Sequence, residues 1–144
     1  MGQTLQVAIA HQNAEARNTL HAGVSQLGHA VCFHAGTGRE LIESARTRRP
    51  DLVVVQEYLP DMDGLQAATE AARGDAIPTI VVVATHDGAL VERRDSENVL
   101  AILREPVRQS DLTPVLPLVM NRFSQLQELR NEIESLQWEL DTGE

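Results

Sequence analysis

The sequence of 144 residues predicts one α/β domain built on a parallel sheet, followed by a long C-terminal helix. Five short runs rich in Val, Ile, Leu and Ala alternate with stretches of helical periodicity, which is typical of repeated βα units. Two runs, at 52–55 and 80–83, are apolar at every position, as expected for strands covered by helices on both faces. Residues 126–140 instead repeat apolar residues in a heptad pattern, which indicates a helix that pairs along one stripe.

The predicted strands cover residues 5–10, 30–34, 52–56, 79–84 and 99–104, with the third and fourth expected at the centre of the sheet. The first helix begins at Asn13, whose side chain can cap it, and ends at Gly28. We predict a second helix over 38–48 and a third over 63–74. The stretch 87–98 has few apolar residues and gives the weakest helix pattern.

The last helix is predicted to begin at Ser110, as its N-cap, with Asp111 in its first turn. It runs past Pro114 to about residue 140, and Pro117 is expected to kink it or delay its start. Its heptad a and d positions form a predicted dimer seam of Leu126, Leu129, Ile133, Leu136 and Leu140. About 30 residues at 1.5 Å each outrun a small sheet, so the C-terminal half should project. The alternative is a helix folded back onto its own domain.

All twelve basic residues are arginines, and the formal net charge is −9, of which 109–144 carry −5 through seven acids and two arginines. The absence of lysine excludes Schiff-base and phosphate-loop lysine chemistry. The surplus of acids argues against nucleic-acid contact by these residues. Cys32 alone makes no disulfide and is expected to be a buried, inert thiol. Without a membrane-length apolar run or a signal-peptide pattern, we expect a cytoplasmic protein, and no cofactor is predicted.

The segment RPDLVVVQEYLPDMDG at 49–64 resembles the third strand and following loop of response-regulator receiver domains. In that family a Pro-Asp-Leu-Val motif and a Pro-x-Met-x-Gly motif occur at this separation. The apolar strand at 5–10, the segment IPTIVVVA at 77–84 and Pro106 after the fifth strand agree with the same pattern. The resemblance covers about 5–118 and implies a flavodoxin-like (βα)5 fold with strand order 2-1-3-4-5.

In receivers, two acids hold magnesium, an aspartate accepts the phosphoryl group, a threonine or serine ends the fourth strand, and a lysine follows the fifth. The resemblance places different residues at these positions, namely His11, Gln12, Gln56, Val83 and Glu105. An amide at 56 cannot form an acyl phosphate, and a carboxylate at 105 repels a phosphoryl group. The aromatic switch of the fifth strand is replaced by Ile102. These departures predict a pseudo-receiver with a degenerate phosphoacceptor pocket and no catalytic residue.

Residues 105–136 resemble the fifth helix and linker coiled coil of ANTAR-type transcription antiterminators. In that family the coiled coil leads into a three-helix RNA-binding module, so the resemblance implies RNA contact only beyond residue 144.

We predict a non-enzymatic, two-component-type regulator with a pseudo-receiver core at 1–108 and a helical segment at 109–144. It would form a homodimer and dock a sensor or regulator protein, with no membrane partner. The alternative is a stand-alone interaction adaptor without an RNA role, which a gene ending at residue 144 would favour.

Several other polar residues have competing interpretations. A His11–Glu105 pair at the sheet edge could titrate near neutral pH, but two polar side chains filling a disused pocket is the favoured interpretation. A metal site that adds Glu57 to them has no spacing motif and is not predicted. Asp63 is expected to cap the third helix, and an enzymatic alternative would need phosphorylation of Asp61 or Glu57. The other histidines are expected at scattered surface positions: His21, His29, His34 and His86.

Overall fold

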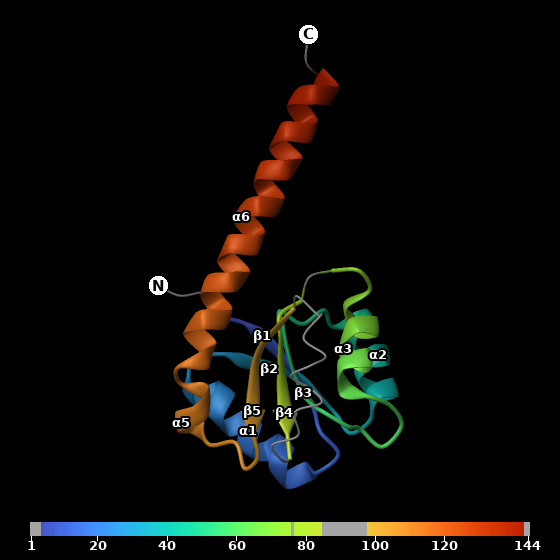
Figure 1. Ribbon diagram of the computed structural model, residues 1–144, viewed down its shortest axis with the longest axis vertical. Coiled ribbons are helices and arrows are strands. Elements are labelled where there is room, and N and C mark those ends of the chain that lie inside the picture. The colour runs from blue at the N-terminus through green and yellow to red at the C-terminus, as the bar shows by residue number, and fades with distance from the viewer. Residues whose placement is uncertain (1–3, 76, 85–97, 143–144) are drawn as a thin grey trace.

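The computed structural model describes residues 4–75, 77–84 and 98–142 and shows a five-stranded parallel sheet with helices on both faces (Figure 1). The strands are β1 (Gln6–Ala10), β2 (Ala30–Ala35), β3 (Leu52–Gln56), β4 (Thr79–Val83) and β5 (Val99–Arg104). Their order is β2-β1-β3-β4-β5, which confirms the predicted flavodoxin-like topology. β3 occupies the centre, with β1 and β4 hydrogen-bonded on either side of it.

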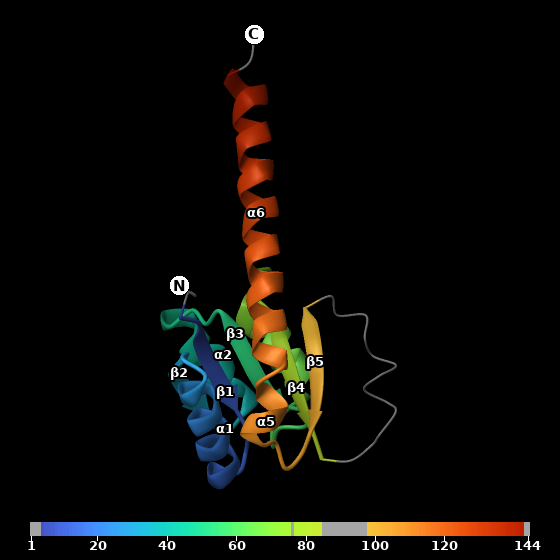
Figure 2. The ribbon, with the colours of Figure 1, turned by 90° about the vertical axis from the view of Figure 1, so that its left-hand side faces the viewer.

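The core has two apolar layers, one on each face of the sheet. Helices α2 (Gly38–Thr47) and α3 (Gly64–Ala72) cover one face. Helix α1 (Ala14–Gln26) covers the other, together with the chain that follows β5 (Figures 1 and 2). Successive residues of each strand alternate between the layers, so Ala8 packs toward α2 and α3 and Ile9 toward α1. This two-sided burial explains why the inner strands are apolar at consecutive positions.

Side-chain caps and a glycine set the ends of α1 and the start of α2, and of these Asn13 and Gly28 were predicted. The Asn13 side chain accepts a hydrogen bond from the Ala16 amide at 3.1 Å and caps α1, and Gly28 follows with a φ of 92°. Thr37 caps α2 by accepting from the Glu40 amide at 3.1 Å. The helix predicted over 87–98 lies outside the described residues except for Asn98.

Cys32 lies at an irregularity in the pairing of β1 with β2. Val7 pairs with Val31 and Ala8 with Phe33, so Cys32 is an extra residue in β2. Its thiol donates to the Val7 carbonyl oxygen at 3.5 Å. Cys32 is half-buried and not buried as expected, because it lies in an edge strand. Its partial burial raises the pKa of the thiol.

The C-terminal region forms two helices where the sequence predicted one. The short α5 (Gln109–Leu112) ends before Pro114, and α6 (Val115–Thr142) begins after it. A proline at 114 has no amide to bond back to the preceding turn, so the helix breaks there. Pro117 is tolerated as the third residue of α6, where amides have no partner within the helix. The predicted N-cap at Ser110 is wrong, because α5 begins after Arg108. The backbone amide of Arg108 donates to the Asp111 carboxylate at 2.9 Å.

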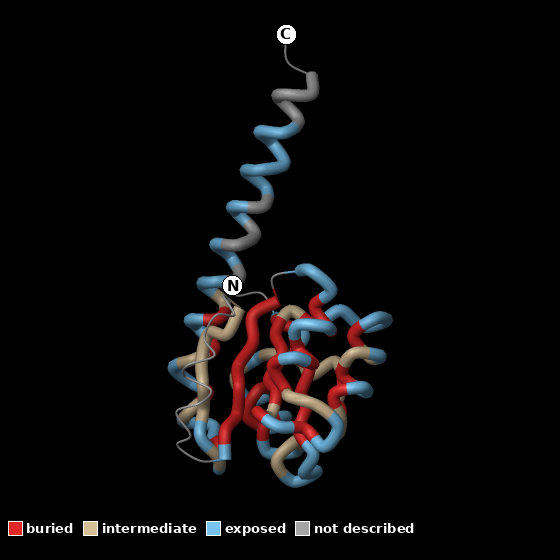
Figure 3. Tube along the Cα trace, turned by 45° about the vertical axis from the view of Figure 1, so that its right-hand side comes forward, coloured by how far each residue is buried: buried red, intermediate tan, exposed pale blue. Residues whose placement is uncertain are grey.

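Helix α6 leaves the domain instead of folding back onto it (Figures 1 and 2). Leu116 and Val119 at its base are buried in the core, whereas Leu129, Ile133 and Leu136 are 54%, 55% and 54% exposed. The burial pattern in Figure 3 shows the same change along the helix. Its C-terminal half therefore projects, as predicted, with an apolar stripe that this chain leaves uncovered. No helix in the described part of the chain has the length and apolar character needed to cross a bilayer.

Candidate functional site

The five positions singled out by the receiver pattern gather at the carboxyl edge of the sheet. His11 and Gln12 directly follow β1, Gln56 ends β3, and Val83 ends β4. Glu105 follows β5, and its amide donates to the Val83 carbonyl at 2.8 Å. Parallel strands with short offsets bring these ends together, which is where ligands bind in this class of sheet.

His11 and Glu105 are in direct contact, which is the arrangement that sequence reasoning did not favour. The imidazole is almost fully buried, at 3% exposure, and its Nε2 atom faces Glu105 Oε1. The Asn13 amide donates to His11 Nδ1 at 3.0 Å. Because a backbone N–H can only donate, Nδ1 accepts and the ring proton lies on Nε2, from which it is donated to the carboxylate. This tautomer directs the Nε2–H group of His11 at the Glu105 carboxylate.

Gln12 and Gln56 form a second pair at the edge. Gln56 Oε1 accepts a hydrogen bond from the backbone amide of Gln12 at 2.9 Å. Val83 is buried and packs in the core together with the partly buried Ile102, so neither position offers a hydroxyl or an aromatic switch. The amide that replaces the phosphoacceptor is thus held against the end of β1.

The donor set at this edge does not fit a magnesium ion. Magnesium is held in proteins by carboxylates and other hard oxygen ligands in near-octahedral geometry. Here the two magnesium positions and the acceptor position provide an imidazole and two amides, and the oxygen of Gln56 already accepts from the Gln12 backbone amide. The carboxylate at this edge, Glu105, is bonded to His11. Across the residues that the structure describes, no three His, Cys, Asp or Glu side chains gather as a metal-ion site.

The acidic residues of the β3–α3 loop have structural roles. Asp63 caps α3, as predicted, and accepts from the amides of Leu65 at 2.8 Å and Gln66 at 3.3 Å. Asp61 caps a different helix, since its two carboxylate oxygens accept from the amides of Gly38 at 2.8 Å and Arg39 at 3.0 Å. The hydrogen bond from Gly38 lowers the pKa of Asp61. No local pattern predicts this second cap, because Gly38 and Asp61 are 23 residues apart.

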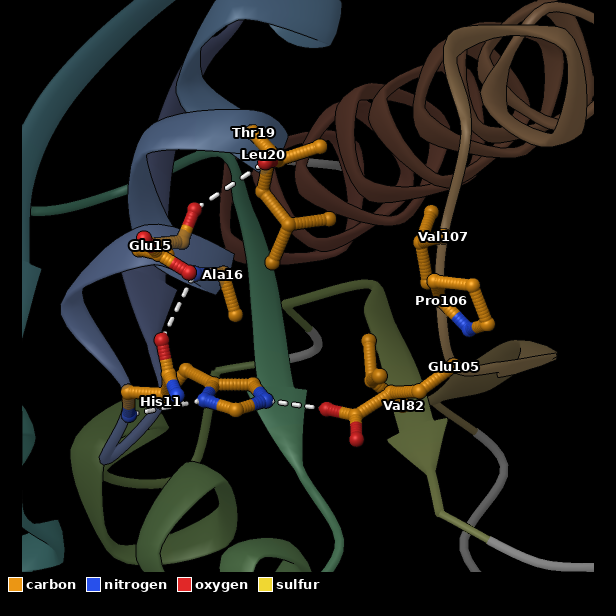
Figure 4. Close-up of a pocket in the computed structure, with 10 residues that line it drawn as sticks. His11, Glu15, Ala16, Thr19, Leu20, Val82, Glu105, Pro106 and Val107 are labelled. Carbon is orange, nitrogen blue, oxygen red and sulfur yellow. Dashed lines mark hydrogen bonds and ion pairs between the residues drawn. The ribbon is translucent and has the colours of Figure 1, made fainter.

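A pocket of about 420 Å³ opens beside the His11–Glu105 pair, between α1 and the connection from β5 to α5 (Figure 4). His11 and Glu105 reach toward each other from its two sides and close one end of it. The other lining residues come from the start of α1, from β4 and from the β5–α5 connection: Asn13, Glu15, Ala16, Thr19, Leu20, Val82, Pro106 and Val107. Sequence reasoning did not find this pocket, because its walls come from residues 11–20, 82 and 105–107.

Two histidines expected to be scattered lie against each other. His21 Nδ1 on α1 and His34 Nε2 on β2 are 2.9 Å apart, and their rings meet edge to face with centroids 5.1 Å apart. His29 accepts a hydrogen bond from the Leu5 amide at 3.0 Å, and His86 lies outside the described residues. Burial, and then the neighbouring His21 and Arg17, lower the pKa of His34.

The His21–His34 contact predicts that acid weakens the fold. A histidine whose pKa is lowered by folding binds fewer protons in the folded chain than in the unfolded one, so stability falls as the pH drops through 6.5 toward the folded-state pKa. We expect the urea midpoint of the wild type to fall more between pH 7.5 and 5.5 than that of His34→Gln. The loss should be modest because the pair is partly exposed. Parallel pH profiles for the two proteins would contradict this assignment.

The sheet order, the helices on both faces and a site at the strand ends define a flavodoxin-like α/β domain. Within this class, residues 7–116 match the response regulator receiver domain family, and the chain belongs to that family.

Two curated relatives extend the match. The transcriptional regulatory protein PdtaR of Mycobacterium tuberculosis is 34% identical over 136 residues, which are 94% of this chain and 66% of PdtaR. The positive alginate biosynthesis regulatory protein of Pseudomonas aeruginosa is 31% identical over 114 residues, which are 78% of this chain and 46% of that protein. The chain thus spans no more than about two thirds of these relatives' length.

Solved structures show the same fold. The signal receiver domain of a modulated diguanylate cyclase from Desulfovibrio desulfuricans matches with a TM-score of 0.76 at 24% identity, covering 85% of this chain and 98% of that one. The anti-anti-sigma factor PhyR from Bartonella quintana matches with a TM-score of 0.79 at 19% identity, covering 90% and 53%. At these identities the likeness concerns the fold alone.

Proposed function

We propose that this chain is a pseudo-receiver that signals without phosphorylation, through homodimerisation along α6 and through docking of partner proteins. The observation that carries the proposal is the state of the receiver edge. All five family positions are replaced, Gln56 is bonded to the Gln12 amide, and Glu105 is bonded to His11.

The chemistry of phosphoryl transfer supports this proposal. An acyl phosphate needs a carboxylate nucleophile, a divalent cation on hard ligands and a positive group to balance the added charge. Gln56 has no carboxylate that could act as the nucleophile. Glu105 adds negative charge where the family has a lysine. The remaining carboxylates are poorly placed as nucleophiles, because Asp61 is engaged by two amides of α2 and Glu57 is buried.

The projecting half of α6 supports a parallel homodimer. Its seam of Leu126, Leu129, Ile133, Leu136 and Leu140 has a branched Ile133 at an a position and leucines at d, a combination that favours two parallel strands. In a parallel pair, Glu132 at g faces Gln137 at e of the other copy without charge repulsion. An antiparallel pair would instead set acidic g positions against each other. We assign residues 1–108 to the receiver core and residues 109–144 to the fifth-helix region, which packs on the core at Leu112, Leu116 and Val119 and then extends into the coiled-coil segment.

The resemblance to ANTAR-type antiterminators supports a place in a cytoplasmic transcription regulator. So do the names of the two relatives, one a transcriptional regulatory protein and the other an alginate biosynthesis regulatory protein. RNA contact would then belong to a segment beyond residue 144, since 109–144 carry a net charge of −5. The alternative function is a protein-interaction adaptor without an RNA role. The sequence of the gene downstream of codon 144, read for a three-helix pattern, separates these two functions.

Treatment with a small phosphodonor tests the proposal directly. We expect the intact mass of the chain to stay unchanged after incubation with acetyl phosphate and magnesium, because no carboxylate stands at the acceptor position. A receiver domain that retains the aspartate should gain about 80 Da under the same conditions. An adduct on this chain, mapped to Asp61, Glu57 or any other residue, would overturn the phosphorylation-independent function.

A further inference from the structure

We propose that the pocket beside the His11–Glu105 pair binds a small organic cation, in which an ammonium or guanidinium group is carried on a short apolar stem. The pocket measures about 420 Å³, within the range of about 300–1,000 Å³ that is typical of small-molecule sites. At about 30 Å³ per water it has room for about fourteen waters, so a ligand of roughly ten non-hydrogen atoms fits.

The charge of the lining selects a cation. Glu15 and Glu105 line the pocket, and the ten lining residues include no lysine or arginine. The hydrogen bond from the Asn13 backbone amide to His11 Nδ1 matters here, because it selects the tautomer with the ring proton on Nε2, in which the imidazole carries no charge. The His11–Glu105 pair therefore retains the full negative charge of the carboxylate, where an imidazolium would have cancelled it. His11 also fixes Glu105 in place, which lowers the ordering cost when a ligand binds.

The remaining walls of the pocket suit an apolar stem. Leu20, Val82 and Val107 are buried side chains, and Ala16 and Pro106 complete the wall (Figure 4). An alkyl chain that covers this surface should gain about fourfold in affinity for each methylene it buries. A bare inorganic cation gains nothing from these walls, so the site discriminates against it.

The position of the pocket links such a ligand to the rest of the molecule. One wall belongs to α1 and the other to the connection that leads into α5 and the base of α6. A bound cation would hold these two parts together beside Glu105. This inference rests on the proposed function in one respect, namely that Glu105 serves no phosphotransfer role. The proposed function and the cation site can fail separately. The proposed function is tested by the phosphoryl mass adduct, and the cation site is tested by ligand binding.

A titration of the full chain with butylguanidinium, followed by backbone amide NMR and calorimetry, tests the site. We expect saturable shifts at amides around the pocket, including Ala16, Thr19 and Val107. Four control ligands should bind at least tenfold more weakly: butanol, which lacks the charge; pentanoate, which reverses it; guanidinium, which lacks the stem; and magnesium chloride. Equal binding of any control, or no saturable binding of butylguanidinium, would overturn the proposal.

Three variants locate the binding. Glu105→Gln keeps an oxygen that can accept from His11 but removes the charge, and it should weaken butylguanidinium binding about tenfold or more. Ala16→Leu fills the pocket and should abolish binding, with an amide spectrum that shows the fold intact. Glu128→Gln on the exposed part of α6 removes one equal charge elsewhere and should leave the affinity unchanged. Equal losses in Glu105→Gln and Glu128→Gln would mean that binding follows net charge, and the site would be rejected.

Discussion

Replacement of Leu129 and Ile133 by aspartate is expected to convert the chain from a dimer to a monomer. Light scattering of the wild type at tens of micromolar should give twice the mass of one chain, and the double variant should give the mass of a single chain. Both side chains lie on the projecting half of α6 and are about half exposed in the isolated chain. A contiguous apolar stripe of this kind on a helix indicates a surface that a second chain covers.

The size of the effect follows from the area still to be buried. Covering the exposed half of each side chain is worth about 1 kcal/mol, or about 4 kcal/mol over the four copies in a dimer. Losing it weakens the dimer about a thousandfold, before the cost of burying four carboxylates is added.

A matched control separates the seam from the added charge. Asn131→Asp with Ser135→Asp puts the same two charges on the opposite side of α6, at exposed positions outside the heptad seam. This variant should remain dimeric. A wild-type monomer at tens of micromolar, or equal dissociation of both variants, would contradict the proposed seam.

Local patterns were enough to predict most of the fold. The strands were placed to within one residue at each end, because their apolar runs are bounded by polar or turn-forming residues. The caps at Asn13 and Asp63 were predicted because each bonds amides only two or three residues away. Features that depend on neighbours in sequence are the ones that a single sequence reveals.

The start of α5 shows where local reasoning failed. Ser110 is a good N-cap by residue type, but Asp111 competes by accepting from the Arg108 amide one turn earlier. The break at Pro114 then separates α5 from α6, although the apolar pattern runs through both. Two adjacent capping residues give no indication in sequence of which one the backbone uses.

Only those parts of the candidate site that follow from the sheet topology could be predicted. Because the carboxyl ends of parallel strands share one edge, the positions His11, Gln56 and Glu105 could be placed together in advance. The pocket, the His21–His34 contact and the cap of α2 by Asp61 could not, since each joins residues on separate elements. Their formation depends on side-chain directions that only the packed structure defines.

Gly64→Ala is expected to destabilise the domain by about 3 kcal/mol, at the upper end of the usual cost of forcing extra atoms into a packed site. A Cβ at Gly64 would lie 1.9 Å from the Gln56 carbonyl oxygen and 3.0 Å from Val55 Cγ2, and neither the backbone nor the central strand can yield easily. Urea unfolding measures the loss directly.

Gly36→Ala provides the control for that measurement. Its Cβ would have the Arg17 side chain as its nearest neighbour, at 3.5 Å, so its stability should stay within about 0.5 kcal/mol of the wild type. The Gly64→Ala clash also pushes on Gln56, whose side chain bonds the Gln12 amide. We therefore expect the backbone amide signal of Gln12 to shift in Gly64→Ala. Equal stability of the two variants would show that β3 and the loop before α3 have room to separate. It would also show that Gly64 is not needed to keep Gln56 in place at the end of β3.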